Sequence, residues 1–505
     1  MPGRMEFEFR FGTAAARQPV RPADGTPFRI LVLGDFRGSA DRESDPAHGR
    51  TTAIDVDNFE AVFTRFGPEL DVPGGSGDGR TTVAFRSLED FHPDSLYARL
   101  EIFRTLRNTR DELGDHATFP GAMARLLGES SASGVAGAAA ARVEPAGAAA
   151  PKESDDAALE RLLGRPPGGG RSVAVDITGL LQQLVAPYIV PGKDPRTDTL
   201  VALVDTASEG LMRTILRSTA FRSLESTWRG LHNLVTSEAC GEDVEIHLLD
   251  APHHPLAADL LANSAALERS ELCRAIAERA DGPGGVPWSL VVGAYAFGTD
   301  EASLRLVAAL GAIARRAGGP LVAGASPALL GCDSFAKTPG HADWPPLADE
   351  DATAWNALRK TPDAPWIALV APRVLMRQPY GRKSDPVERF AFEEIPPGHD
   401  HESLPWGHPA FALAQLLAAS FTERGFEMEP GDHRDLGDLP AHTTVTDGEA
   451  ALTPCAEVFL TESTATAMLD RGVTAMVSVR NRAAVVVPRF QSIADPPAPL
   501  AGPWS

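Results

Sequence analysis

The chain has 505 residues, of which 43% are hydrophobic and 23% charged, and its formal net charge is −21. This length predicts two to four domains with enough material for large cores. The acidity argues against a nucleic-acid partner and against anionic membrane surfaces, because both require clustered lysine and arginine. Its simplest interpretation is solubility.

Targeting and redox features favour the cytoplasm. The first residues lack the apolar core of a secretory signal, and no apolar run reaches the roughly 18 residues that a membrane-spanning helix needs. The four cysteines lie far apart with no C-x-x-C pair, which favours reduced thiols. We therefore predict a cytoplasmic protein without direct membrane insertion.

Residues 1–26 contain one patterned piece, in which apolar Met5, Phe7, Phe9 and Phe11 alternate with charged side chains. This period of two predicts a strand with one face for a core and one for water. The turn-rich residues that follow would act as a tether. Such a strand either folds back onto its own domain or pairs with an exposed sheet edge of another copy.

Residues 27–127 are predicted to form a small mixed α/β unit. We expect strands at 28–36 and 81–88, and helices at 56–66 and 92–113. The second helix begins after a proline and places Leu96, Leu100, Phe103 and Leu106 on one face. Residues 128–171 are rich in Ala, Gly, Ser and Pro, which predicts a flexible linker, with 157–164 as a candidate short helix.

Residues 172–430 are predicted to form a second, larger unit. In 211–235 apolar residues recur at spacings of mostly three or four, which predicts a buried helix face broken near 218–220. Beyond it, apolar strands alternate with helical segments, so we expect a largely parallel sheet. The strands are 244–250, 288–297, 320–326 and 366–375, and the helical segments are 256–279, 300–317 and 409–424.

Residues 431–505 are predicted to add a strand, a helix and a two-stranded hairpin. The strand is expected at 455–461, the helix at 463–472, and the hairpin around Arg480–Arg482. The last dozen residues are rich in Pro and Ala, which predicts a loose tail. The overall fold class is therefore α/β, with two mixed units joined by a flexible linker and a tethered amino-terminal strand.

Patterns typical of catalytic and metal sites are weak. There is no G-x-S-x-G element, and nothing in the sequence places Asp35 and Asp90 together as a carboxylate pair. His399, His401 and His408 lie near acidic residues, where H-x-H can bind a metal, but polar loops of this kind are usually only solvated. We predict no catalytic residue, no metal and no cofactor, and an unfamiliar enzyme is the least favoured hypothesis.

Several blocks resemble the large sheath subunit of type VI secretion systems. The strongest reads F-x-x-L-E-x-x-W-R-G-L and consists here of Phe221, Leu224, Glu225, Trp228, Arg229 and Gly230. The other blocks are WSLVVGAYAF, PLVAGASPALLG, Trp355–Arg359, Pro372–Arg373, Pro379–Tyr380–Gly381, and Trp406–Gly407 within PWGHPAFALA. Together the blocks cover roughly residues 172–493. From the residues alone, Trp228 is favoured as buried core over an interface.

The first unit is similar to the small sheath subunit of the same systems. It has a buried strand ending in L-G-D-F-x-G, followed later by an S-L-x-D-F-x-P element. The motif residues are Gly34, Asp35, Phe36, Asp90, Phe91 and Pro93. The chain thus resembles a fusion of a TssB/VipA-like with a TssC/VipB-like subunit. The large subunit normally continues well beyond the position of Ser492, so we expect its carboxy-terminal strand to be missing here.

The resemblance implies a structural and mechanical role. It implies a subunit that polymerises around an inner tube and contracts to drive the tube outward, with Met5, Phe7, Phe9 and Phe11 on an inter-subunit strand. The implied partners are further copies of the chain, the inner-tube ring protein and baseplate components, and an AAA+ unfoldase is a further candidate. The alternative is a non-polymerising adaptor, cap or assembly factor with a sheath-like fold.

Overall fold

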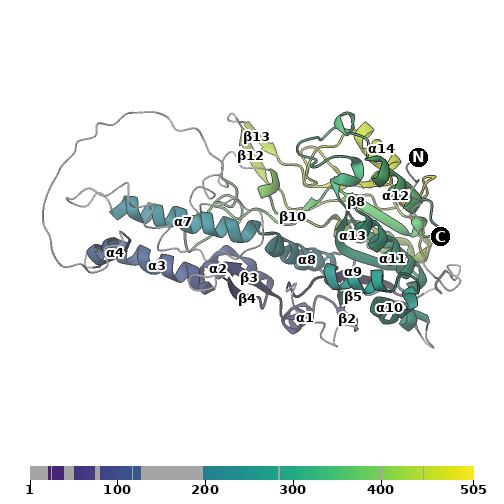
Figure 1. The fold of residues 1–505 in the computed structure, drawn as a ribbon, viewed down its shortest axis with the longest axis horizontal. Helices are drawn as coiled ribbons and strands as arrows, with labels where there is room; N and C mark the ends of the chain where they lie inside the picture. The colour runs from purple at the N-terminus through teal and green to yellow at the C-terminus, as the bar shows by residue number, and fades with distance from the viewer. Residues whose placement is uncertain are drawn as a thin grey trace, which may run out of the picture.

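The computed structural model has an α/β fold, which confirms the predicted class (Figure 1). It describes residues 21–23, 25–38, 50–73, 80–115, 118–126, 197–281, 285–396, 401–446 and 449–505. The predicted strand at 5–11 and the predicted linker at 128–171 lie outside these residues.

A seven-stranded sheet forms the centre of the body, in the order β14-β8-β7-β6-β1-β5-β2. All neighbouring strands are parallel except β2, which lies antiparallel to β5 at one edge. The strands are β1 (Phe28–Gly34), β2 (Thr52–Ile54), β5 (Val244–Asp250), β6 (Leu290–Phe297), β7 (Leu321–Ala325), β8 (Ile367–Ala371) and β14 (Thr474–Ala475).

Strand β1 lies between β5 and β6, although more than 200 residues separate it from either along the chain. Its register pairs Phe28 with Val244 on one side and Ile30 with Leu290 on the other. Successive side chains of β1 enter two different cores, with Val32 in one and Leu33 in the other. A strand buried on both faces requires a continuous apolar run, which FRILVLG supplies.

The two predicted units therefore share one sheet. The segments 27–127, 172–430 and 431–505 each contribute at least one strand to it. The composition of the linker predicted two separate units, but β1 of the first unit pairs on both sides with strands of the second unit. The predicted boundaries mark segments of sequence and not separate sheets.

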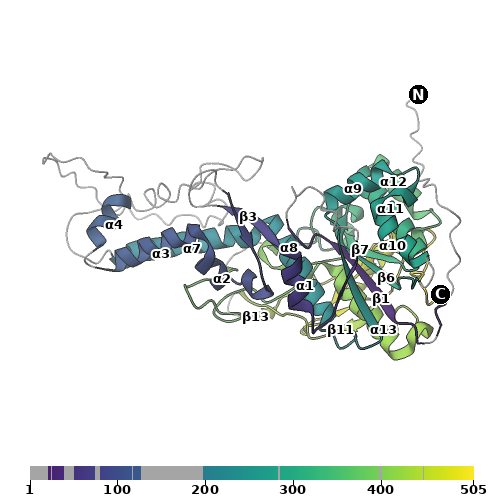
Figure 2. The same cartoon turned by 90° about the horizontal axis from the view of Figure 1, so that it is seen from below.

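Helices cover both faces of this sheet (Figures 1 and 2). One face packs on α9 (His253–Ala262), α10 (Glu271–Asp281), α11 (Glu301–Ala317), α12 (Asp349–Arg359) and α14 (Glu462–Asp470). The other face packs on α8 (Thr219–Val235) and α13 (Pro409–Arg424), with α1 (Phe59–Phe66) in the same core. Helix α13 has the predicted bounds, and α11 begins after its Asp300 cap, whose carboxylate accepts from the Ser303 amide.

The predicted break near 218–220 is confirmed. Helix α7 (Thr197–Arg217) ends at Ser218, whose extended backbone and side-chain hydroxyl begin α8 by accepting from the Phe221 amide. Helix α7 packs on α3 (Glu101–Gly114), and together with α4 (Phe119–Leu126) they extend away from the sheet as an arm (Figure 2).

The predicted helix at 92–113 is wrong as a single element. It consists of α2 (Pro93–Arg99) and α3, separated at Leu100, whose backbone is extended. The predicted apolar face is nevertheless buried, since Leu96, Leu100, Phe103 and Leu106 are all at most 3% exposed. The bend lets both short helices present apolar residues to one core.

The carboxy-terminal region differs from its prediction in two places. Residues 455–461 form no strand beyond one isolated bridge at Ala456, because the backbone turns at Glu457 with a φ of 33°. The predicted loose tail is packed, with Leu500 1% exposed and the Trp504 ring stacked 6.4 Å from Phe28. The tail thus closes the core over the start of β1.

Smaller sheets complete the fold. The predicted hairpin is present as β15 (Val477–Ser478) and β16 (Val485–Val486), extended by β11 (Asp435–Leu436). Three further pairs are β3 (Glu69–Pro73) with β4 (Arg80–Ala84), β9 (Val374–Leu375) with β10 (Trp406–Gly407), and β12 (Thr443–Thr446) with β13 (Glu449–Leu452). Short 3₁₀ turns occur at Leu88–Phe91, Leu267–Arg269, Pro327–Leu330, His341–Asp343, Ala364–Trp366, His401–Ser403 and Gly425–Glu427.

Because β1 is paired on both sides, cutting the chain between residues 128 and 171 should not separate the halves. We expect a variant with a protease site at that position to elute from gel filtration as one species after complete cleavage, and to separate only in denaturant. Uncleaved protein is the control. Two native peaks after cleavage would contradict the shared sheet.

Candidate functional site

Helix α8 presents Trp228 to an aromatic cluster built by the first half of the chain. The indole is completely buried, and its Nε1 donates a 2.9 Å hydrogen bond to the Phe36 carbonyl oxygen. Its ring centroid lies 4.4 Å from that of Phe63 and 5.3 Å from that of Phe36. The W-R-G motif of the second half therefore packs on the L-G-D-F motif of the first half. The favoured interpretation of Trp228 as buried core is confirmed.

The L-G-D-F turn is shaped to approach α8 closely. A Cβ on Gly34 would lie 3.2 Å from side-chain atoms of both Thr227 and Ala294. The Asp35 carboxylate closes the turn by accepting from the backbone amides of Arg37 and Gly38, at 3.1 and 2.7 Å. The turn thereby carries the Phe36 carbonyl to the indole.

The second small-subunit motif packs on the same helix. The Phe91 ring stacks 4.3 Å from Phe85 and meets Phe221 of α8 edge-on at 5.6 Å. Asp90 closes its own turn by accepting from the Arg86 amide at 2.6 Å. Pro93 is the first residue of α2, a position where its missing amide proton costs nothing. Asp35 and Asp90 thus serve two separate turns.

A buried network of four charges and a phenol links α8 to residues 377–394. Glu225 accepts from Arg229 at 2.8 Å and from Arg377 at 2.7 Å. Arg377 also binds Glu394 at 2.7 Å and lies 3.9 Å from the Tyr380 ring centroid. The Tyr380 hydroxyl accepts from the Arg229 guanidinium, and the Tyr380 backbone amide donates to the Glu394 carboxylate. The two carboxylates and two guanidinium groups give the network a net charge of zero.

Electrostatics keep this network ionised. Burial disfavours a charged Glu225, but Arg377 and Arg229 outweigh burial and lower the pKa of its carboxyl. Burial likewise opposes the charge of Arg377, and Glu225 with Glu394 raise its pKa well above the ordinary value. Burial also raises the pKa of the Tyr380 phenol, which therefore keeps its proton.

Sequence reasoning missed Arg377 and Glu394 as members of the site. The signal was the adjacency of the A-P-R-V-L-M-R and Q-P-Y-G blocks, which places Arg377 three residues before Tyr380. Charged residues are mostly exposed in proteins, so a sequence gives little reason to expect these two in a core.

The histidine-rich loop forms an ion-pair cluster. His401, Glu402 and Glu457 have ligand-type atoms within 4.8 Å of one another. Arg373 binds both carboxylates, with 2.9 Å from its Nε to Glu457 and 3.0 Å from its Nη2 to Glu402. The guanidinium thus supplies the positive charge that a metal would bring to these carboxylates. Pro372, which precedes Arg373, follows a cis peptide bond.

The remaining histidines lie elsewhere. His408 caps α13, with its Nδ1 accepting from the Ala410 amide and its Nε2 donating to the Tyr295 carbonyl at 2.7 Å. The bond from the Ala410 amide requires an unprotonated Nδ1 and therefore a neutral ring, and burial lowers the pKa of His408 to about 4. His399 lies outside the described residues, as do Met5, Phe7, Phe9 and Phe11.

Three motif glycines allow close approach between elements. A Cβ on Gly230 would lie 2.4 Å from the Phe411 ring of α13, and one on Gly381 would lie 2.3 Å from the Glu393 carboxylate. A Cβ on Gly407 would lie 2.7 Å from that of Met376. The predicted residues around them have structural contacts as well. Leu224 is buried in the core, Trp406 donates to the His401 carbonyl, and the Pro379 carbonyl accepts from Ser384.

Comparison with known families decides what this arrangement belongs to. Residues 198–494 match the VipB family, described as EvpB/VC_A0108, tail sheath N-terminal domain. The chain belongs to this tail sheath family. Residues 13–121 match a second family, described as type VI secretion system, VipA, VC_A0107 or Hcp2. The chain is therefore a TssB/TssC-like fusion, as the sequence motifs predicted.

Two relatives from Pseudomonas aeruginosa agree with this division. The type VI secretion system sheath protein TssC1 is 31% identical over 258 residues, covering 50% of this chain and 51% of TssC1. The sheath protein TssB1 is 26% identical over 122 residues, covering 23% of this chain and 69% of TssB1. The chain thus spans about half the length of TssC1. The contacts of Trp228 and Phe36 join the TssC-like to the TssB-like part.

Removing one charge from the network should destabilise the fold strongly. We expect Glu225→Gln to lower the free energy of unfolding by about 3–5 kcal/mol, because Arg377 and Arg229 lose a buried partner. Urea unfolding measures the change. Glu209→Gln is the matched control, because Glu209 pairs with Arg213 at a partly exposed i,i+4 site and should cost at most about 1 kcal/mol.

The same residue predicts a pH dependence. The pKa of Glu225 is lower in the folded chain than its ordinary value of 4.5, so its stabilising contribution is complete above that value. The contribution is lost as the pH falls below 4.5 and through the folded pKa. The stability of the wild type should therefore fall more steeply than that of Glu225→Gln in this range, and equal slopes would contradict the assignment.

A methyl group at Gly230 should separate α8 from α13. We expect Gly230→Ala to cost at least about 1–3 kcal/mol, because the new Cβ overlaps the Phe411 ring. Gly210→Ala in α7 is the control. Nothing lies within 4 Å of a Cβ at Gly210, so this change should stabilise the helix by about 0.5–1 kcal/mol. Equal melting temperatures for the two variants would contradict the packing.

Proposed function

We propose that this chain polymerises with copies of itself into a contractile type VI-like sheath that surrounds an inner tube and drives it outward. Its membership of the tail sheath family supports a sheath subunit role. The observation that carries the proposal is the shared sheet, in which the TssB-like strand β1 lies between TssC-like strands. Each copy then brings both sheath parts in a one-to-one ratio.

The described residues include a site where a donated strand could pair. The hairpin β12–β13 stands apart from the central sheet, and each of its strands is paired only with the other among the described residues (Figure 1). A two-stranded hairpin is marginal by itself, and a third strand would add main-chain hydrogen bonds. We propose that Met5–Phe11 of a neighbouring copy supplies this strand, with its apolar face toward the neighbour.

Contraction requires bodies that rotate without unfolding. The aromatic cluster around Trp228 and the neutral network around Glu225 both fix α8 within the body. A rigid body on a strand linkage can move from a metastable extended lattice to a tighter one while the linkage persists. The work then comes from assembly and needs no cofactor.

The partners follow from this role. We propose the inner-tube ring protein and baseplate components as partners, and an AAA+ unfoldase as a candidate for disassembly, all in the cytoplasm. Membership of a structural sheath family suggests a role other than catalysis. Among the described residues, no helix combines the length and apolar character needed to cross a bilayer.

Electron microscopy of the purified chain tests the proposal. We expect tubules or short rings from the full chain, and folded protomers without assembly after deletion of residues 1–12. Phe9→Pro should act like the deletion, because proline removes a ladder hydrogen bond, whereas Ala15→Pro in the predicted tether is the matched control. Pelleting quantifies assembly, and circular dichroism checks the fold.

Two outcomes would contradict the proposal. Wild-type protein that stays monomeric under every assembly condition would contradict the sheath. Full assembly after the deletion, with an ordinary tubule lattice, would contradict strand donation and leave the sheath role in place.

A further inference from the structure

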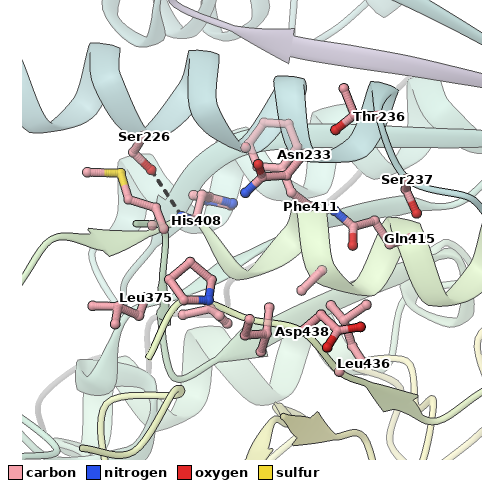
Figure 3. Close-up of a pocket in the computed structure, with 18 of the residues that line it drawn as sticks. Ser226, Asn233, Thr236, Ser237, Leu375, His408, Phe411, Gln415, Leu436 and Asp438 are labelled. Atoms are coloured by element: carbon pink, nitrogen blue, oxygen red, sulfur yellow. Dashed lines mark hydrogen bonds between the residues drawn. The ribbon is translucent and has the colours of Figure 1, made fainter. Parts of the chain in front are cut away.

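A groove of about 560 Å³ lies between α8, α13, the β9–β10 pair and the segment 436–440 (Figure 3). Its volume falls within the roughly 300–1,000 Å³ of ordinary ligand clefts. Asn233 of α8 and Gln415 of α13 lie on one side, and Asp438 lies across from them. None of the motif contacts described above fills this space.

The groove is electrostatically suited to a cation. Its lining includes the carboxylates of Asp438 and Glu238 and no lysine or arginine. His408 adds no positive charge, because its Nδ1 accepts from the Ala410 amide and must therefore be unprotonated. The carboxyl end of α8 at Val235 adds the negative end of a helix dipole close to Thr236 and Ser237 of the lining.

The rest of the groove suits an arginine side chain on an extended peptide. Phe411 and Leu375 are apolar lining residues that the methylene stem of such a side chain can contact. The amide groups of Asn233 and Gln415 can bind peptide groups, since each carries both donors and acceptors. Asp438 has a backbone φ of 55°, which aspartate and asparagine tolerate better than most residues.

The chain itself carries a segment of matching charge. Between Glu8 and Asp24 there is no carboxylate, and the stretch contains Arg10, Arg17 and Arg21. The Arg21 guanidinium forms an exposed ion pair with Glu427 of its own body, at 3.6 Å. Arg17 lies four residues before Arg21, so an extended chain can carry it up to about 14 Å from that residue. It can therefore enter the groove of a neighbouring copy that lies within this distance.

We propose that this groove binds the arginine-bearing segment 12–20 of a second copy of the chain, which follows the donated strand Met5–Phe11, with the Arg17 guanidinium attracted by the carboxylates of Asp438 and Glu238. The proposal rests on the strand donation proposed above and adds a second contact made by the same amino-terminal arm.

Charge removal in the full chain tests the groove. The double variant Glu238→Gln, Asp438→Asn should raise the critical concentration for assembly about five- to tenfold, because exposed ion pairs contribute up to about fivefold each. Asp57→Asn, an exposed aspartate outside the groove, is the matched control and should leave the critical concentration unchanged. Unchanged melting temperatures exclude misfolding as the cause.

Charge reversal identifies the occupant. Arg17→Glu should weaken assembly like the groove variant, and combining it with Glu238→Arg should restore most of the loss. Arg165→Glu, in another carboxylate-free stretch of the chain, should have no effect. Normal assembly of the double groove variant would overturn the proposal and leave the sheath role intact. If Arg165→Glu weakened assembly and Arg17→Glu did not, Arg17 would not be the residue that binds the groove. A wild type that never assembles would contradict the sheath role itself.

Discussion

The pairing of β1 with β5 on one side and β6 on the other is the constraint on which the rest of the fold depends. Both neighbours come from the TssC-like part, so the TssB-like part lacks a complete sheet without them. The bond from the Trp228 indole to the Phe36 carbonyl holds the turn that follows β1. Both faces of β1 are buried in cores, which makes the two parts one cooperative structure.

Helix α8 connects one of these cores to the charged network. Its Phe221 and Trp228 reach the TssB-like aromatic residues, while Glu225 and Arg229 reach Arg377 and Tyr380. The aromatic contacts supply hydrophobic stabilisation. The buried ions cost much of their attraction in desolvation, so their main effect is to fix one arrangement of α8 against residues 377–394.

Helices and strands could be predicted where a short stretch of sequence carries a clear apolar pattern. The residues VEIHLLD form β5 as expected, and α13 has its predicted bounds because an apolar run follows His408 and Pro409. The sheet order could not be predicted, because no local pattern reveals which strand β1 joins. The turn at Glu457 and the packed Trp504 were missed for a related reason, since each depends on partners distant in sequence. The motif residues of the site were found through family resemblance, whereas Arg377 and Glu394 owe their burial to each other and to Glu225.

The position of β1 has a consequence for synthesis of the chain. A ribosome adding about 5–20 residues per second needs roughly 10–40 s to proceed from β1 to β5. During this interval the nascent FRILVLG segment has no partner strand, and its apolar side chains are open to aggregation. Joining both parts in one polypeptide ensures that the missing strands emerge from the same ribosome, so the vulnerable period has a fixed length and does not depend on the encounter of two separately made proteins.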